Sequence, residues 1–461
     1  MTRVPRAAAV AALLLLAGTP VVAGPPNVVV ILADDLGRND CGFMGGTQIK
    51  TPHIDKLAKA GAVLDAFYVQ PVCSPTRAAF MTGRYPMRHG LQVGVIRPWA
   101  RYGLPLEERT VAQALTDAGY ATAIVGKWHL GTITPEYLPT RRGFGFQYGH
   151  YLGAIDYNTH MRDGGFDWHK NDAVNRDEGY STTLIGKAAA QFVTDTAGKK
   201  PFFLYVPFNA VHTPLQAPEE YIRPYSALSM QRRKYAGMLA AMDEEVGRIV
   251  AAVEKAGVRD NTLFLFSSDN GGPSPGTITD NGKYRAGKGT LYEGGVRVAA
   301  FATWDGKIKA GTTVTAPMHI VDWYPTLVKL CGAKAEQKLP LDGRDVWPCL
   351  ADGKPSPHEA ILLNTTPTSG AVRVGDWKLV VKNGTDNPDG AAPKKKAGKA
   401  SVELFDLKAD PYEKTNLAGT NTEKLAELRA KLAAFAKQAI PSKNAPKAKG
   451  FVSPKVWGEK D

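Results

Sequence analysis

The sequence has few cysteines and only one long apolar run. Four cysteines in 461 residues are too few for disulfides to be the main support of the fold. Beyond the N-terminus, no stretch is long and apolar enough to span a membrane. The basic residues are dispersed, apart from three lysines at 394–396 and a lysine-rich tail, and neither run alternates with aromatic residues. Nucleic-acid binding is therefore not expected.

The one long apolar run lies at residues 7–17, behind Arg3 and Arg6 and ahead of the small residue Ala23. This pattern predicts a cleaved signal peptide at residues 1–23 and an exported protein, periplasmic or secreted; a retained N-terminal anchor is the alternative. The formal net charge is +13, two units of which belong to this leader. The positive charge favours polyanionic partners, although a generally basic exported protein would show it too.

The remaining chain is long enough to bury a large core. Short apolar runs alternate with longer helical patterns, which is typical of a mostly parallel sheet covered by helices. Continuous apolarity indicates strands buried on both faces, at residues 28–33, 121–125, 202–206 and 262–266. Helices are predicted at residues 107–118 and 234–256. In the second, apolar residues recur at three- and four-residue steps and should be core: Met238, Met242, Val246, Ile249 and Val253.

The pattern changes after about residue 350. Antiparallel strands are predicted within residues 371–382 and 402–407, around a polar loop at 383–400, and an amphipathic helix follows at 423–438. We therefore predict a catalytic domain at 24–350, a smaller α+β domain with an antiparallel sheet at 351–440, and a basic, poorly packed tail at 441–461. Cys331 and Cys349 flank a short segment and are candidates for a disulfide, whereas Cys41 has no evident partner.

Each predicted strand of the large sheet is followed by polar residues. These are Asp34 and Asp35, then Lys127 and His129, then Asn209 and His212, and finally Asp269 and Asn270. Because ligands bind beyond the carboxyl ends of parallel strands, we expect these groups to converge. Adjacent buried carboxylates need a cation, and a donor set of oxygens suits Ca²⁺, or Mg²⁺, better than zinc. The alternative is that Asp34 and Asp35 cap the following turn.

Cys73 precedes a predicted helix, with Ser74 as N-cap and Pro75 in the first turn. The helix N-terminus favours negative charge, and Arg77 would point back at the same place. These features predict an activated thiolate or an anion site, while a buried inert cysteine is the alternative.

Two long motifs stand out: CSPTRAAFMTG at residues 73–83 fits C-x-P-x-R-x-x-x-x-T-G, and GYATAIVGKWH at 119–129 fits G-Y-x-T-x-x-x-G-K-x-H. They resemble the signatures of the type I, formylglycine-dependent sulfatase family. The similarity continues through Asp34-Asp35, NAVHTP at 209–214, DNGG at 269–272 and GKGTLYEGG at 287–295, and on to ELFDL at 403–407 and DPYE at 410–413. It thus covers nearly all of the mature chain.

The resemblance implies an alkaline-phosphatase-like α/β/α sandwich with a large, mixed, mostly parallel sheet and a smaller C-terminal domain. Segments such as GKWHLG at 126–131 and LPTRRGF at 138–144 look most like the arylsulfatase B, or N-acetylgalactosamine-4-sulfatase, subgroup. The implied substrate is a sulfated glycan, with N-acetylgalactosamine 4-sulfate as one candidate, or an aryl sulfate.

The resemblance also implies a mechanism. A maturation enzyme oxidises Cys73 to formylglycine, whose hydrated form supplies the hydroxyl that attacks sulfur. Asp34, Asp35, Asp269, Asn270 and the modified Cys73 would hold the cation. Arg77 would orient the nucleophile, while Lys127 and Lys288 would neutralise sulfate oxygens. His212 would protonate the leaving oxygen, and His129 would take the proton whose loss releases sulfate. The alternatives are that the two lysines are solvated surface residues and that the two histidines are only hydrogen-bonded in the interior.

Substrate contacts are less defined by the sequence. Candidates in loops after the motif strands are Trp99, Arg101, His150, Tyr157 and His160. Two other functions remain open: a phosphonate or phosphodiester hydrolase on the same fold, and a catalytically silent protein that binds sulfated glycans with Cys73 unmodified.

Overall fold

The computed structural model describes residues 24–366, 369–382 and 400–459. The predicted signal peptide and nearly all of the predicted polar loop at 383–400 lie outside these residues. No helix among those described is long and apolar enough to cross a membrane.

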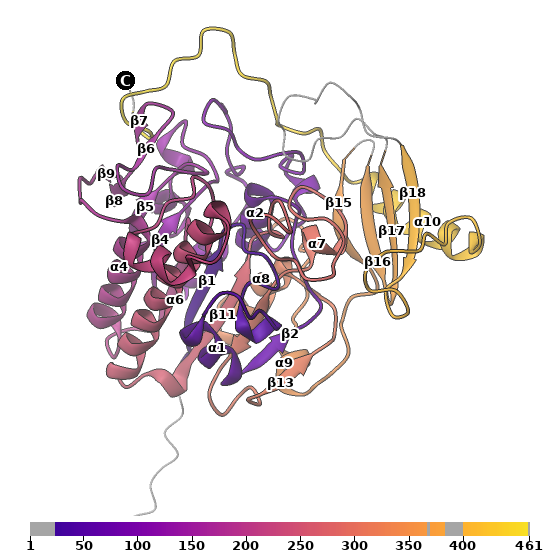
Figure 1. Ribbon diagram of the computed structural model, residues 1–461, viewed down its shortest axis with the longest axis horizontal. Helices are drawn as coiled ribbons and strands as arrows, with labels where there is room; N and C mark the ends of the chain where they lie inside the picture. The colour runs from indigo at the N-terminus through magenta and orange to yellow at the C-terminus, as the bar shows by residue number, and fades with distance from the viewer. Residues whose placement is uncertain (1–23, 367–368, 383–399, 460–461) are drawn as a thin grey trace, which may run out of the picture.

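A ten-stranded sheet forms the centre of the molecule (Figure 1). In spatial order its strands are β13 (Thr312–Val314), β2 (Ala62–Leu64), β12 (Ala300–Thr303), β11 (Thr262–Ser268), β1 (Asn27–Ala33), β10 (Phe202–Pro207), β4 (Ala121–Lys127), β5 (Phe146–His150), β8 (His169–Lys170) and β9 (Ala173–Val174). The five strands from β11 to β5 are parallel, and β12 and β8 join them antiparallel. The predicted mixed, mostly parallel sheet is confirmed, and all four predicted strands are present in it.

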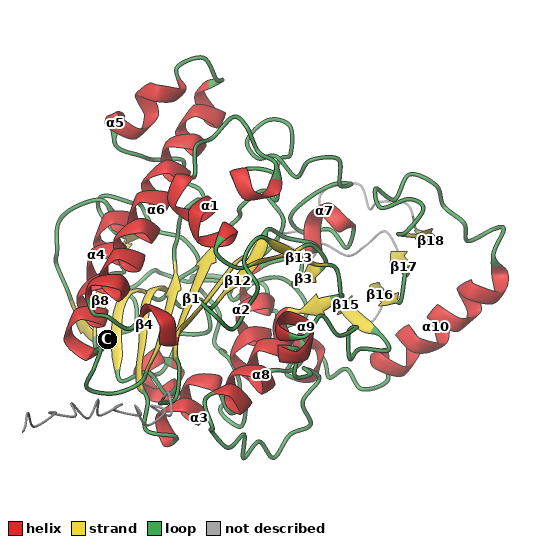
Figure 2. Ribbon diagram, turned by 90° about the horizontal axis from the view of Figure 1, so that it is seen from below, coloured by secondary structure: helices red, strands yellow, loops and turns green. Residues whose placement is uncertain are grey.

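Helices cover both faces of this sheet (Figure 2). On one face lie α1 (Pro52–Lys59), α4 (Ser181–Thr196) and α6 (Met230–Lys255), and on the other α2 (Cys73–Thr82), α3 (Val111–Asp117) and α8 (Trp323–Leu330). Alternate residues of β1 belong to the two cores: Val28, Val30 and Leu32 to one, and Val29, Ile31 and Ala33 to the other. This explains the continuous apolarity of the strand, since both of its faces are buried.

The two long predicted helices are present with shifted ends. In α6 the five periodic apolar residues are fully buried, as predicted. Helix α3 begins at Val111 rather than at 107, because Thr110 and Gln113 form a capping box. Thr110 Oγ1 accepts from the Gln113 amide at 3.1 Å, and the Gln113 side chain accepts from the Thr110 amide at 2.9 Å. Short helices α5 (Glu219–Ile222), α7 (Glu293–Val296) and α9 (Trp347–Ala351) lie in the connections.

A four-stranded antiparallel sheet lies beside the large sheet (Figure 1). Its strands are β15 (Ile361–Thr365), β16 (Gly370–Val374), β17 (Trp377–Lys382) and β18 (Ser401–Asp406), and α10 (Thr422–Ala436) follows them. The predicted strand region 371–382 is thus two strands, which turn at Gly375 with φ +57°. Two-stranded pairs complete the fold: β3 (Phe67–Tyr68) with β14 (Met318–His319), and β6 (Met161–Arg162) with β7 (Gly165–Phe166).

Two details differ from the sequence-based expectations. Cys331 and Cys349 are free thiols rather than a disulfide, and Cys349 Sγ lies 3.4 Å from the carbonyl oxygen of Pro355. The C-terminal tail is largely exposed, as expected. Near its end, however, Trp457 is only 3% exposed and packs against the β6–β7 pair.

Candidate active site

The polar strand ends converge at one edge of the large sheet. Asp34 and Asp35 follow β1, Asp269 and Asn270 follow β11, and Lys127 ends β4. The backbone amide of Asp269 donates to the carbonyl of Ala33 at 3.0 Å, which holds the two acidic ends side by side. All five polar side chains are at most 3% exposed. The convergence expected from parallel strand order is therefore present.

Four potential metal donors lie together here. One ligand atom from each of Asp34, Asp35, Cys73 and His212 lies within 4.8 Å of the others. Asn270 joins them, since its Nδ2 donates to Asp35 Oδ1 at 2.7 Å and its Oδ1 lies 3.5 Å from Cys73 Sγ. Asp269 lies behind them, where its Oδ1 accepts from the Asp35 amide at 3.3 Å. Oxygen donors dominate this set, which fits Ca²⁺ or Mg²⁺ by its chemistry.

Three cations of the chain neutralise the three carboxylates. Arg77 Nη2 lies 2.8 Å from Asp269 Oδ2, Lys127 pairs with Asp34, and Lys288 Nζ lies 2.7 Å from Asp35 Oδ1. Burial raises the pKa of Asp269, and Asp34 adds to this while Arg77 opposes it. For Asp35, burial acts in the same direction, but Lys288 and His212 outweigh it and hold its pKa below the usual value. Arg77 was predicted to point at the site of Cys73, and in the structure it reaches the site through its ion pair with Asp269.

Cys73 is the first residue of α2 and is 1% exposed. The helix starts two residues earlier than predicted: Val72, not Ser74, occupies the N-cap position, without a side-chain cap. Ser74 is therefore not the N-cap; instead its hydroxyl donates to the carbonyl of His129 at 3.0 Å and accepts from the Ile96 amide at 3.0 Å. Ser74 thereby links the start of α2 to the segments that hold His129 and Ile96.

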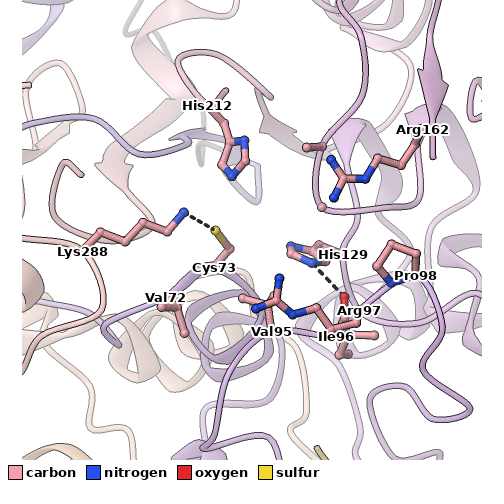
Figure 3. Close-up of a pocket in the computed structure, with 12 residues that line it drawn as sticks. Val72, Cys73, Val95, Ile96, Arg97, Pro98, His129, Arg162, His212 and Lys288 are labelled. Carbon is pink, nitrogen blue, oxygen red and sulfur yellow. Dashed lines mark hydrogen bonds between the residues drawn. The ribbon is translucent and has the colours of Figure 1, made fainter. Parts of the chain in front are cut away.

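The sulfur of Cys73 lies near a carboxylate and an ammonium group. It lies 3.4 Å from Asp34 Oδ1 and 3.7 Å from Lys288 Nζ (Figure 3). Burial raises the pKa of the thiol, and Asp269 and Asp34 raise it further against the opposing lysines. The interpretation of Cys73 as an activated thiolate is thus not supported by its surroundings, because they favour the neutral thiol.

His129 and His212 lie on opposite sides of the pocket above Cys73 (Figure 3). His212 Nε2 is 3.6 Å from Asp35 Oδ2, and its Nδ1 is 2.6 Å from the carbonyl of Thr213, to which only a protonated nitrogen can donate. His129 Nε2 lies 3.0 Å from the carbonyl of Ile96. Burial lowers the pKa of His212 to about 3, and burial together with Lys127 and Arg77 keeps that of His129 well below its usual value. Both imidazoles are neutral at pH 7.

Two of the site residues have left-handed backbone conformations. Asp35 has φ 61° and His129 has φ 60°, values that few residues other than glycine adopt. Such conformations persist where the surrounding structure fixes them, and they cluster at functional sites.

The pocket above Cys73 has a volume of about 240 Å³. It is lined by Val72, Cys73, Val95, Ile96, Arg97, Pro98, His129, Gly153, Ala154, Arg162, His212 and Lys288. Sequence reasoning missed Arg97 and Arg162, which direct their guanidinium groups toward the open space (Figure 3). They lie in segments without a recognisable motif, and nothing in the sequence marked them.

None of the five weaker candidates is among the described residues that line this pocket. His150, Tyr157 and His160 are at most 2% exposed: the first and third stack on Trp168, and the Tyr157 hydroxyl lies 2.7 Å from the carbonyl oxygens of both Asn209 and His212. Arg101 is exposed, and Trp99 Nε1 donates to the carbonyl of Ala445 at 3.4 Å. Tyr157 supports the backbone of His212, but direct substrate contact by these residues stays a prediction without geometric support.

Comparison with known proteins identifies the family. The family model described as Sulfatase matches residues 26–333. The chain belongs to the sulfatase family. It is 37% identical to arylsulfatase J of Mus musculus, over 94% of this chain and 80% of that protein, and 35% identical to arylsulfatase A of Homo sapiens, over 88% and 86%.

A solved structure agrees with this assignment. The structure described as Ps i-CgsB in complex with k-i-k-neocarrahexaose has a TM-score of 0.82 and 32% identity, and the match covers 90% of this chain and 94% of that one. Sulfatases with this architecture are enzymes that hydrolyse sulfate esters, and this sulfatase is an enzyme of the same kind. The arylsulfatase B subgroup stays a prediction.

Proposed function

We propose that this sulfatase removes sulfate from a sulfated sugar by means of a formylglycine formed from Cys73 and one bound Ca²⁺. The observation that carries the proposal is the position of the Cys73 sulfur. It lies at a helix N-terminus and at the end of a pocket, 3.4 Å from Asp34 and 3.7 Å from Lys288. Formylglycine at this position would supply the oxygen nucleophile for sulfur in place of a thiol.

The metal site would be formed by Asp34, Asp35, Asp269, Asn270 and the modified Cys73. Their oxygen donors and near-complete burial suit Ca²⁺, with Mg²⁺ as the alternative. A bound cation supplies positive charge beside the sulfate oxygens and lowers the pKa of a hydroxyl near it. The chain's own cations, Arg77, Lys127 and Lys288, already balance the three carboxylates, so the site can form before the metal arrives.

Lys127 and Lys288 are the groups that would neutralise the sulfate oxygens. Lys127 is fully buried and Lys288 is 17% exposed on its side chain, so the field of each ammonium is little screened by water. Lys288 lies close to Cys73. Burial lowers the pKa of the Lys288 ammonium, but the negative charge of Asp35 outweighs burial and raises that pKa above its usual value. A fixed cation aimed at the place where negative charge develops stabilises the transition state. Arg77 would keep the Asp269 carboxylate in position through their ion pair.

The two histidines would handle the protons. With Nδ1 of His212 donating to the Thr213 carbonyl, Nε2 faces the pocket and is the atom that would carry a proton to the leaving oxygen. Arrival of an anionic ester raises the proton affinity of that nitrogen, which Lys127 and Lys288 lower in the free protein. His129, across the pocket, would accept the proton whose loss releases sulfate.

The substrate is proposed to be a sulfated glycan. Three of the pocket-lining residues are cations, namely Lys288, Arg97 and Arg162. The solved relative is described as a complex with k-i-k-neocarrahexaose, which supports a sugar substrate here. An N-acetylgalactosamine 4-sulfate remains one candidate and an aryl sulfate another.

The deciding experiment is mass spectrometry of the peptide that holds Cys73, on protein from its native host or from a host with a formylglycine-generating enzyme. After denaturation and alkylation, we expect Cys41, Cys331 and Cys349 to be labelled and position 73 to have the lower mass of an aldehyde. Cys73→Ala should release no sulfate from 4-nitrophenyl sulfate or from sulfated disaccharides, with unchanged thermal unfolding. An unmodified thiol at position 73 in an active preparation would overturn the proposal.

The same preparation separates the alternatives. Faster hydrolysis of an aryl phosphodiester than of an aryl sulfate would favour the phosphodiesterase function, which a similar fold can support. Tight binding of sulfated sugars with an unmodified Cys73 and no turnover would instead indicate a binding protein.

A further inference from the structure

The C-terminal tail crosses the molecule and contacts both loops at the mouth of the pocket (Figure 1). We call residues 440–457 the C-terminal strap. Its first part lies along residues 87–99: the Ile440 amide donates to the carbonyl of Met87 at 3.0 Å, and the Lys443 amide donates to that of Gly90 at 2.8 Å. The indole of Trp99 then donates to the carbonyl of Ala445 at 3.4 Å.

The last part of the strap forms a single β-bridge with the β6–β7 hairpin. Phe166 pairs with Val456 in a parallel bridge: its amide donates to the carbonyl of Lys455 at 2.9 Å, and its carbonyl accepts from the Trp457 amide at 2.9 Å. The indole of Trp457 donates to the carbonyl of Arg162 at 2.8 Å. At Gly165 an added Cβ would lie 2.5 Å from the carbonyl oxygen of Pro454, so the two segments are in close contact.

This attachment gives the hairpin its support. Each strand of the β6–β7 pair has two residues, and an isolated two-stranded hairpin is at best marginally stable. Trp457 is 3% exposed and is the one buried residue among the described part of the tail after 440. Burial of this indole removes a large apolar surface from water at the point where the strap meets the hairpin. The strap therefore adds contacts that the two short strands lack between themselves.

Each of the two segments that the strap contacts contributes one arginine to the pocket lining. Residues 95–98 contribute Arg97, and the hairpin contributes Arg162, while Lys288 lies at the inner end beside Cys73. Among the described residues that line the pocket there is no carboxylate. Asp163 lies outside the lining, 3.3 Å from Arg162 Nε, and offsets part of that charge. The described lining of the pocket thus contains two guanidinium groups in addition to Lys288, and no carboxylate.

We propose that Arg97 and Arg162 form a second anion subsite, which binds a carboxylate or a further sulfate of the sugar beyond the sulfate that is removed, and that Trp457 positions Arg162 for this role. The proposal rests on the proposed function in one respect: it assumes that the sulfate to be cleaved occupies the Cys73 end of the pocket. A planar guanidinium binds a carboxylate or sulfate through paired hydrogen bonds, which makes arginine suited to this task.

The subsite is tested by binding, so that the result does not depend on turnover. Isothermal titration calorimetry would compare sucrose octasulfate with inorganic sulfate. The R97Q/R162Q double variant should bind the octasulfate about tenfold or more weakly, as expected for the loss of charged hydrogen bonds, while its Kd for inorganic sulfate changes less than about twofold. Arg141→Gln, which removes an exposed arginine away from the pocket, is the matched control for general charge effects and should bind both anions like the wild type.

The role of Trp457 is tested by two variants. Trp457→Phe keeps an aromatic ring but loses the donor to Arg162, and Trp457→Ala loses both; each should weaken octasulfate binding and leave inorganic sulfate binding unchanged. Val452→Ala is the control, because Val452 is 83% exposed on the same strap. Thermal unfolding of each variant separates loss of the hairpin from loss of the fold, since Trp457→Phe should unfold within a few degrees of the wild type.

The possible failures are distinct. Equal weakening toward both anions, or unchanged octasulfate binding in the double variant, would refute the subsite whatever the catalytic result. Absence of sulfate release from every sulfate ester tried, with selective octasulfate binding intact, would refute the proposed function and leave the subsite standing. Normal octasulfate binding in both Trp457 variants would show that Arg162 is positioned without the strap.

Discussion

The ammonium of Lys288 lies 3.7 Å from the sulfur of Cys73 and 2.7 Å from a carboxylate oxygen of Asp35. The lysine comes from the connection after β11, while the cysteine begins α2, 215 positions earlier in the chain. One ammonium thus links the predicted nucleophile position to the predicted metal site.

Replacement of Lys288 by Met should lower kcat/KM for sulfate release by about 10²–10³-fold, the usual cost of removing one fixed group that stabilises transition-state charge. The exposed Lys283, five residues earlier, provides the matched control, and Lys283→Met should keep activity within about twofold. Steady-state sulfate release from 4-nitrophenyl sulfate measures both. Comparable losses in the two variants would mean that Lys288 acts through overall charge.

His212→Asn should reduce the rate in a way that depends on the leaving group. A general acid contributes about 10²–10⁴-fold when the leaving oxygen needs a proton. We expect a loss in that range for a sugar sulfate and a much smaller loss for 4-nitrophenyl sulfate, because nitrophenolate leaves without a proton. Equal losses for both substrates would assign His212 to another step, such as metal binding, which its place beside Asp35 also allows.

Removal of divalent metal should abolish activity without unfolding the protein. The three buried carboxylates keep their partners Arg77, Lys127 and Lys288, so the apo form retains charge balance. After EDTA treatment, Ca²⁺ at about 100 times its Kd should restore activity and stabilise the fold by about 2.7 kcal/mol. Differential scanning calorimetry with Ca²⁺, Mg²⁺ or Zn²⁺ compares the metals, and larger stabilisation by Zn²⁺ would contradict the oxygen-donor interpretation.

A buried lysine connects the small sheet to helix α7. Lys378 of β17 lies 2.8 Å from both Glu293 of α7 and Glu413, and all three side chains are fully buried. Lys378→Met removes the cation that Glu413 is paired with and leaves Glu293 with Arg297 alone, so it should lower the free energy of unfolding by about 3–5 kcal/mol. The exposed pair Lys329–Asp345, with a separation of 2.7 Å, is the control: Lys329→Met should cost less than about 1 kcal/mol. Denaturant titration of both variants measures the difference.

Buried neutral histidines should make the fold acid-sensitive. Burial lowers the pKa of His89 to about 3, and burial together with His358 lowers that of His319 to about 3. The unfolded chain binds protons near pH 6.5, so stability is fully present above that pH and is lost as pH falls toward 3. Each such histidine adds a slope of roughly 1.4 kcal/mol per pH unit in this window. His319→Gln should reduce the slope, which urea titrations between pH 4 and 7 would measure.

Much of the site was predictable because the apolar runs that form strands and the motifs are local patterns in the sequence. Asp34, Asp35, Asp269 and Asn270 were marked by the buried strands before them, and Cys73 by the motif around it. Parallel strands then bring their carboxyl ends to one edge, which places these residues together without further information. By contrast, the ion pair of Arg77 with Asp269 joins segments 192 positions apart and could only be seen in the structure.

What the sequence determined by itself is the family, the layered fold and the identity of the chemical groups, since each depends on local periodicity or on an uninterrupted motif. The tertiary structure decided which side chains reach the pocket. It excluded His150, Tyr157 and His160 from the pocket lining, placed Arg97 and Arg162 there, and anchored the tail through Trp457. These outcomes depend on packing between distant segments, and a pattern read along one stretch of chain contains no information about such packing.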